Sequence, residues 1–150
     1  MTAIVRILAI EDEQDSIYRA LVQWRLHGYF VTQAGNLEDA AQQLSASKFD
    51  LIVADVRLPS RLDGSRIEQF GGIELIDKLR TGSFGVRNRK TPFMVVTAQR
   101  GSLKENFIRS RGDCLGIFDK LQFVAIEKAV SEFVDNMQVK PKRPRGRKRD

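Results

Sequence analysis

Hydrophobic residues in this chain gather into short runs, and amphipathic stretches separate one run from the next. The runs at residues 4–10, 50–55 and 92–96 are almost continuously apolar, as expected of strands buried on both faces of a sheet. Residues 29–34 and 114–118 are the other two strand candidates. Because apolar residues at helical spacing follow each run, the pattern predicts five β-then-α units and a parallel sheet with helices on both faces.

The five predicted helices are recognised by an apolar face and by residues that favour helix ends. Asp15 or Ser16 is expected to cap the first helix, which stops near His27. Asn36 is expected to cap the second, with Asp39 three residues later. The apolar positions of the other three are Ile73, Ile76 and Leu79, then Leu103 and Phe107, then Phe123, Ile126, Val130, Phe133, Val134 and Met137.

Two connections are longer than those that usually join such elements. They cover residues 60–70 and 81–91, and both are polar and rich in Arg with Gly or Ser. We expect both to be exposed insertions. The pattern leaves open whether residues 65–70 form an extra helical turn.

Composition places the chain among globular domains and removes several kinds of site. At 150 residues and 42% hydrophobic content it can bury the core of one domain. No apolar run approaches the ~20 residues of a membrane span and the start does not resemble a signal peptide, so a cytoplasmic protein without a membrane partner is expected. With Cys114 and His27 as the single residues of their kinds, internal disulfides, cysteine-based zinc sites and histidine clusters are excluded. Cys114 is expected to be a small buried residue.

The net charge of +6 belongs to one end of the chain. Residues 140–150 hold seven Lys or Arg and one Asp, and removing them from the totals of 25 basic and 19 acidic residues leaves 18 of each. A run of like charges with Pro and Gly does not pack. We therefore expect a neutral domain over residues 1–138 and a disordered basic tail over residues 139–150.

Polar residues with complementary chemistry stand at the ends of four predicted strands. They are Glu11 and Asp12, then Asp55, Thr97 and Lys120. The carboxyl ends of parallel strands meet at one sheet edge, where ligands bind in open α/β sheets. Crowded carboxylates raise one another's pKa unless a cation neutralises them, and Mg²⁺ prefers oxygen ligands. The pattern therefore predicts a divalent metal site, for Mg²⁺ or Mn²⁺, at that edge.

The same residues predict a reaction with a phosphoryl group. Asp55 can act as a carboxylate nucleophile, as in proteins that form aspartyl phosphates. Lys120 offers a point charge to the phosphate and Thr97 a hydroxyl donor. Ala98 leaves room beside Thr97.

The runs ILAIEDE, FDLIVADVRLP, MVVTA and IFDK resemble the receiver domains of two-component response regulators, over residues 4–137. The resemblance implies a flavodoxin-like doubly wound (βα)5 fold with strand order 2-1-3-4-5. It also implies that Asp55 accepts a phosphoryl group from a sensor histidine kinase or a phosphotransfer protein. Glu11, Asp12 and the backbone carbonyl of Arg57 would join Asp55 in holding the metal. Phosphorylation would change the binding of a downstream effector protein, so the domain would catalyse only its own phosphorylation and dephosphorylation.

Three features depart from the pattern of that family. Leu121 stands where the family commonly has a proline preceded by a cis bond, and a cis bond before another residue costs ~2.5–4 kcal/mol, so a trans or strained bond is expected. Ile117 replaces a frequent aromatic residue three positions before the lysine. The family's Asp-Gly matches either Asp63-Gly64 or, with better agreement at the next helix, Gly71-Gly72. We interpret this as an insertion of about eight residues that could gate access of the phosphodonor.

Two other functional readings remain open, and a third is disfavoured. A receiver that has lost phosphorylation would be a constitutive interaction module. In the tail, Arg145, Gly146 and Arg147 resemble the AT-hook, which contacts the minor groove of A·T-rich DNA; a nonspecific linker or another acidic partner would fit as well. A haloacid-dehalogenase-type phosphatase needs a second acid two residues after the nucleophile, where this chain has Arg57.

Because little chain follows Met137, output is expected through a partner, the tail or a domain beyond this chain.

Overall fold

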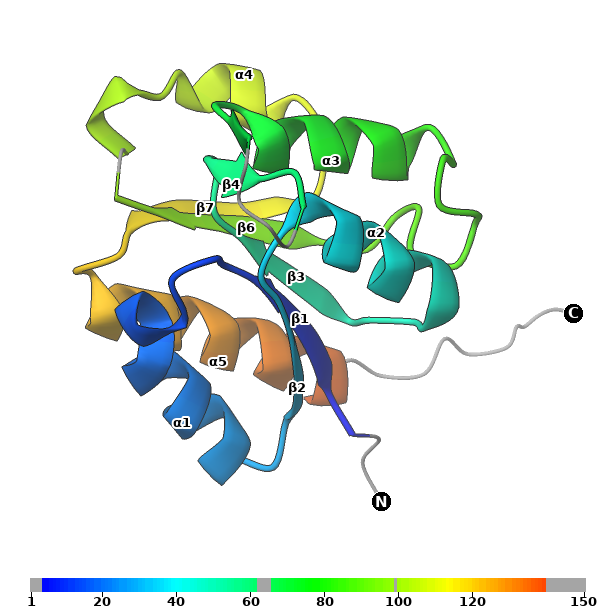
Figure 1. The fold of residues 1–150 in the computed structure, drawn as a ribbon. Helices are drawn as coiled ribbons and strands as arrows, with labels where there is room; N and C mark the ends of the chain where they lie inside the picture. The colour runs from blue at the N-terminus through cyan, green and yellow to red at the C-terminus, as the bar shows by residue number, and fades with distance from the viewer. Residues whose placement is uncertain (1–3, 62–65, 99, 140–150) are drawn as a thin grey trace, which may run out of the picture.

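The computed structural model describes residues 4–61, 66–98 and 100–139. Its centre is a parallel sheet of five strands in the order β2-β1-β3-β6-β7 (Figure 1). The strands are β1 (Arg6–Ile10), β2 (Phe30–Ala34), β3 (Leu51–Ala54), β6 (Phe93–Thr97) and β7 (Cys114–Asp119). Counted along the main sheet this is the order 2-1-3-4-5, so the predicted flavodoxin-like doubly wound fold is confirmed.

Helices cover both faces of the sheet. They are α1 (Tyr18–Leu26) after the 3-10 turn η1 (Gln14–Ile17), α2 (Leu37–Ala46), α3 (Gly71–Arg80), α4 (Glu105–Arg109) after the turn η2 (Arg100–Ser102), and α5 (Phe123–Val139). Figure 1 shows α1 and α5 on one face and α2, α3 and α4 on the other. Successive strand residues point to opposite faces, so in β1 Leu8 packs in the α2–α3 core and Ile7 in the α1–α5 core.

Capping confirms one predicted helix start and corrects another. The amide of Asp39 donates to Asn36 Oδ1 at 2.8 Å, so Asn36 caps α2 as expected. The prediction that Asp15 or Ser16 caps α1 is wrong, because α1 follows η1 and its N-cap is Ile17. The Ser16 hydroxyl instead donates to the Glu13 carbonyl within the preceding turn, at 2.7 Å.

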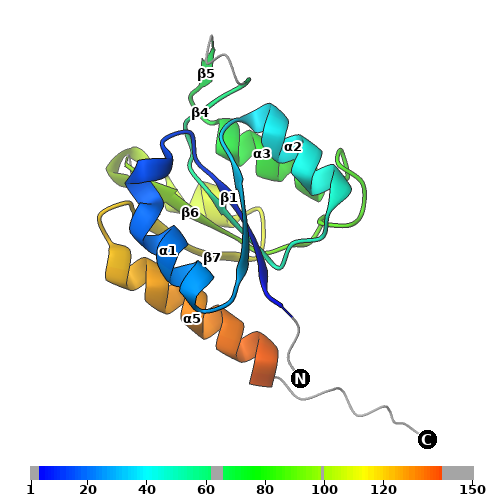
Figure 2. The same ribbon diagram turned by 60° about the horizontal axis from the view of Figure 1, so that its bottom comes forward.

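The first long connection forms a small antiparallel hairpin from β4 (Leu58–Pro59) and β5 (Ile67–Glu68). The Ser60 amide donates to the Arg66 carbonyl at 2.9 Å. Residues 66–70 form no helical turn, and Asp63-Gly64 lie outside the described residues. Figure 2 shows the hairpin projecting at the end of the molecule where β1 leads into α1.

The second long connection, residues 81–91, is not simply an exposed insertion as predicted. Asn88 and Thr91 are fully buried. The Asn88 amide group donates to the carbonyls of Leu44 and Ser47 at 2.8 and 2.6 Å, and its oxygen accepts from the Phe49 amide at 2.8 Å. A buried polar side chain is stable when it is hydrogen-bonded, so this loop is fastened to the chain between α2 and β3. Its polar composition alone does not reveal that.

Candidate functional site

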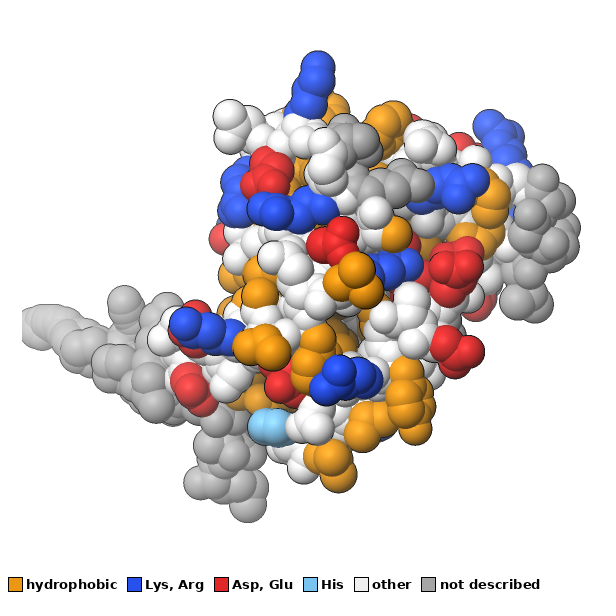
Figure 3. Space-filling view, turned by 90° about the vertical axis from the view of Figure 1, so that its left-hand side faces the viewer, with side chains coloured by type: hydrophobic (Ala, Val, Ile, Leu, Met, Phe, Trp, Pro, Cys, Tyr) orange, Lys and Arg blue, Asp and Glu red, His pale blue; other side chains and the backbone are white. Residues whose placement is uncertain are grey.

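Four of the five strands deliver a predicted site residue to the same edge of the sheet. Glu11 follows β1, Asp55 follows β3, Thr97 ends β6 and Lys120 follows β7. The chain leaves β1 toward one face of the sheet and β3 toward the other, which opens a crevice between their ends. In Figure 3, which looks onto this end, acidic and basic side chains alternate with hydrophobic ones.

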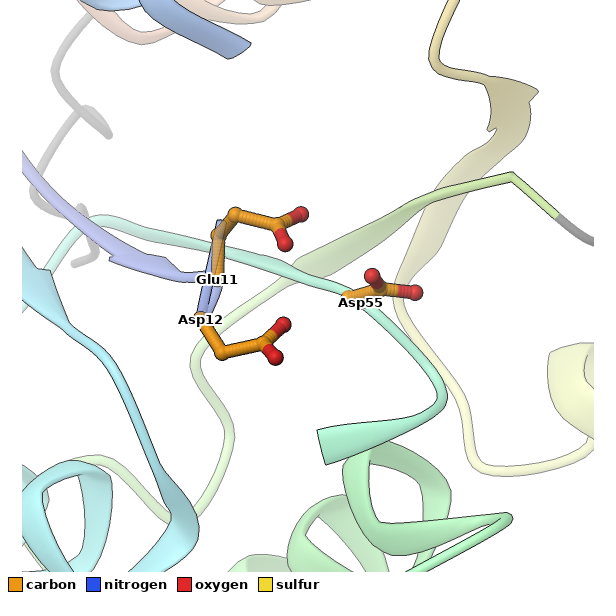
Figure 4. A group of neighbouring side chains, drawn as sticks. All are labelled: Glu11, Asp12 and Asp55. Carbon is orange, nitrogen blue, oxygen red and sulfur yellow. The ribbon is translucent and has the colours of Figure 1, made fainter. Parts of the chain in front are cut away.

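An acidic cluster occupies the crevice. One carboxylate oxygen each of Glu11, Asp12 and Asp55 lies within 4.8 Å of the others, with Glu11 and Asp55 buried and Asp12 exposed. Figure 4 shows the side chains of Glu11 and Asp12 extending in the same direction, toward the side on which Asp55 lies. Backbone amides fix the two buried groups: Glu13 donates to Glu11 Oε2 at 3.0 Å and Val56 to Asp55 Oδ1 at 2.7 Å.

The Lys120 ammonium lies between the two buried carboxylates. Its Nζ is 2.9 Å from Glu11 Oε1 and 3.0 Å from Asp55 Oδ2. Burial on its own would lower the pKa of Lys120, but its bonds to Glu11 and Asp55 and their charges outweigh burial and raise it. The Lys120 amide also donates to the Thr97 carbonyl at 3.1 Å. The lysine is therefore a fixed positive charge at the centre of the site.

Glu11 is the group whose protonation is most altered. Its pKa is raised from 4.5 to about 7, chiefly by burial; the hydrogen bond from Lys120 lowers the pKa and the charge of Asp55 raises it. An added cation would favour the ionised form. With Glu11 ionised, the three carboxylates carry more negative charge than the single Lys120 ammonium neutralises.

A cavity of about 110 Å³ opens beside these groups. Its described lining consists of Asp12, Glu13, Asp55, Arg57, Ile67, Thr97, Ala98 and Lys120. Six of these were expected from the sequence; Glu13 and Ile67 were not. Glu13 lines the cavity because it directly follows the acidic pair. Ile67 lines it because the β4–β5 hairpin places it there, and no local sequence pattern predicts the pairing of those two strands.

The donor set suits a hard divalent cation. Three carboxylates from two strand ends offer oxygen atoms, the ligands that Mg²⁺ and Mn²⁺ favour. The ammonium already placed between two of them shows that positive charge is stable there. Asp12 is exposed and leaves the cluster open to solvent.

The departures noted at Leu121 and Ile117 have structural counterparts. The Lys120–Leu121 bond is trans, the first of the two predicted alternatives, and the lysine still reaches the site. Leu121 is 92% exposed. Ile117 is buried in the core beneath α2, α3 and α4. Cys114, expected to be buried, is half-buried.

Other predicted features fall outside this geometry. Arg145, Gly146 and Arg147 lie beyond the described residues. In the portion that the structure describes, no helix combines the length and apolar character needed to cross a bilayer.

Comparison with known proteins identifies relatives of the fold. No protein-family model and no curated protein matches the sequence. Among solved structures, the non-phosphorylated HemR receiver domain of Leptospira biflexa is 20% identical, with a TM-score of 0.69 over 95% of this chain and 99% of that one. The receiver domain of a Pseudomonas aeruginosa sensor histidine kinase, with magnesium in its active-site cleft, is 19% identical (TM-score 0.68; 89% and 99% covered). The Thermotoga maritima response regulator TrrA, in complex with Mg²⁺ and BeF, is 18% identical (TM-score 0.66; 87% and 99% covered). The chain therefore has the fold of response-regulator receiver domains.

Proposed function

We propose that this chain is a phosphorylation-controlled signalling switch that accepts a phosphoryl group on Asp55. The observation that carries the proposal is the meeting of Asp55 with an acidic pair and with the Lys120 ammonium, 3.0 Å away, at the edge where this fold binds ligands. The donor would be a sensor histidine kinase or a phosphotransfer protein in the cytoplasm. The solved relatives with magnesium or Mg²⁺ and BeF support a metal-dependent reaction.

In the proposed reaction the Asp55 carboxylate attacks the phosphorus of a phosphohistidine. The P–N bond breaks, and the imidazole leaves with the electron pair and takes up a proton. Asp55 Oδ1 accepts from the Val56 amide, whereas Oδ2 is 3.0 Å from Lys120 Nζ. Oδ2 is proposed as the attacking atom. Rate enhancement in such transfers comes mainly from positioning and charge neutralisation.

Three residues would then stabilise the phosphorylated form. The Lys120 ammonium moves from Asp55 Oδ2 to a phosphoryl oxygen, and the Thr97 hydroxyl donates to another. Ala98 keeps space beside them. Mg²⁺ or Mn²⁺, held by Glu11, Asp12, Asp55 and the Arg57 carbonyl, would neutralise phosphoryl charge.

Output would use the surface formed by α4, β7 and α5. Thr97 and Asp119 are register partners in β6 and β7, and the Lys120 amide is bonded to the Thr97 carbonyl. A movement of Thr97 toward a phosphoryl group would therefore shift β7 and the helices beside it. We propose that this changes the affinity for a downstream effector protein.

Labelling with acetyl phosphate in Mg²⁺, followed by intact mass, tests the proposal. Wild type should gain one phosphoryl group, and Asp55→Asn should gain none. Asp135→Asn, an exposed change in α5, is the matched control and should label normally. In Mg²⁺ with beryllofluoride, amide signals near Thr97 should shift. A folded wild type that never labels would favour the constitutive interaction module.

The basic tail is proposed as a separate DNA contact. A chain stopped at Gln138 should label like the full chain but lose DNA binding. Because each phosphate contact releases counterions, binding by the full chain should weaken steeply with salt. Equal DNA binding by both chains would remove this role from the tail.

A further inference from the structure

The cavity beside Asp55 has an apolar wall supplied by the β4–β5 hairpin. Of its described lining residues, Ile67 and Ala98 are apolar and the other six are polar or charged. Ile67 is the larger of the two and is 42% exposed, so it borders both the cavity and bulk solvent. The wall is thus formed by the first of the two long connections in the chain.

The described part of the hairpin holds Ile67 in place. Ile67 is the register partner of Pro59, which is buried. The Ser60 carbonyl accepts from the Glu38 amide at the start of α2, at 3.1 Å. Arg66 and Glu68, on either side of Ile67, form an ion pair at 2.8 Å. The side chain is therefore positioned by the backbone on both strands of the hairpin.

The cavity is small, so this wall limits where water can stand beside Asp55, although the cavity is open to solvent on the side of Asp12. A volume of about 110 Å³ leaves room for only a few waters. A phosphoryl group on Asp55 would fill much of that space. Hydrolysis needs one water in line with the P–O bond to be broken, so an apolar group at the opening lowers the chance that a water is correctly placed.

We propose that Ile67 is a positioning residue that slows hydrolysis of phosphorylated Asp55 by excluding water. This inference rests on the proposed function. In hydrolysis, the oxygen of water attacks phosphorus and the bond from phosphorus to the Asp55 oxygen breaks. Asp55 keeps the electron pair as a carboxylate, and both protons of the water leave with the phosphate as dihydrogen phosphate. Ile67 enters no bond; it sets how often the attacking water is present.

The test compares decay of the phosphorylated protein after loading. Wild type, Ile67→Ala, Ile67→Leu and the control Val86→Ala are labelled with acetyl phosphate in Mg²⁺ and freed of donor, and the phosphorylated mass is followed with time. Val86 is an exposed aliphatic residue in the other long connection. Ile67→Ala should decay about three- to tenfold faster, where tenfold corresponds to about 1.4 kcal/mol in the barrier. Ile67→Leu, which restores apolar bulk, and Val86→Ala should decay like wild type.

Unchanged Mg²⁺ affinity and thermal unfolding in Ile67→Ala would separate water exclusion from damage to the site. If that variant does not fold, Ile67→Val should give a smaller acceleration. Equal decay of wild type and Ile67→Ala, or equal acceleration in Ile67→Leu, would overturn the inference and leave the proposed function intact. Absence of labelling in folded wild type would overturn the proposed function and this inference with it.

Discussion

Gly72 lies directly against the backbone of Asp55. A Cβ atom at Gly72 would stand 2.0 Å from the Asp55 carbonyl oxygen and 3.0 Å from its carbonyl carbon. The Gly72 amide donates to the Val56 carbonyl at 2.9 Å. The start of α3 therefore sets the position of the proposed phosphoacceptor, and it does so only with glycine.

Replacing Gly72 by alanine should damage both stability and the site. We expect Gly72→Ala to lower the free energy of unfolding by about 1–3 kcal/mol, as overpacking does, and to slow acetyl phosphate labelling. Urea denaturation and intact mass measure the two effects. Gly35→Ala is the matched control, because a Cβ there has no atom within 4 Å. Equal stability of the two variants would show that α3 shifts without cost.

Removing the Lys120 charge should make the protein dependent on metal. Lys120→Met leaves Glu11 and Asp55 without their cation, and breaking a buried ion pair costs roughly 3 kcal/mol or more. In metal-free buffer the melting temperature should fall. Added Mg²⁺ should raise it more than in wild type. Lys128→Met, an exposed change in α5, should show neither effect; a Lys120→Met protein indifferent to Mg²⁺ would argue against the metal site.

Metal affinity should depend on pH through Glu11. Its pKa is raised to about 7, so below pH 7 the carboxyl is protonated and must lose its proton before it binds a cation. Affinity for Mg²⁺ should therefore rise by about tenfold from pH 6 to pH 8. Calorimetric titration at the two pH values measures it. Glu11→Gln should bind more weakly and with little pH dependence; a dependence that persists in that variant would assign it to another group.

The raised pKa of Glu11 also has a consequence for folding without metal. The folded state binds the proton more tightly than the unfolded chain, so the stabilisation is present at low pH. It is lost as pH rises from 4.5 to about 7. Metal-free protein should therefore unfold at lower urea concentration at pH 7.5 than at pH 5.5, as far as Glu11 is concerned, and Glu11→Gln should reduce that difference.

The second long connection should prove structural. Asn88→Ala removes three hydrogen bonds to buried or half-buried backbone groups, and each group left unsatisfied costs about 1–3 kcal/mol. We expect a loss of roughly 3 kcal/mol or more in urea denaturation. Asn106→Ala, an exposed change in α4, should have little effect. Similar stability of both variants would mean that water replaces the Asn88 contacts.

The sequence predicted the fold because its signals are periodic and local. Buried parallel strands are continuous apolar runs and the helices carry one apolar face, so each element could be assigned independently. The strand order came from a resemblance, since no local pattern states which strands pair. The start of α1 was misplaced because Ser16 bonds within a turn.

The meeting of the candidate site residues could be predicted as far as it depends on strand ends. Glu11, Asp55, Thr97 and Lys120 were placed by the rule that parallel strands end at one edge. Ile67 and Asn88 were missed as structural participants because their roles arise from contacts between segments. The sequence of a polar loop does not show that one of its side chains is buried, because the segments that bury it are far away in the sequence.

The ion bridge of Lys120 to Glu11 and Asp55 joins residues from near the beginning, the middle and the far part of the domain. A short fragment of this chain would therefore lack part of the proposed site. Acceptance of a phosphoryl group would report that the whole topology is native. A protein that lacks β7, or that is only partly folded, would not gain a phosphoryl group even with Asp55 intact.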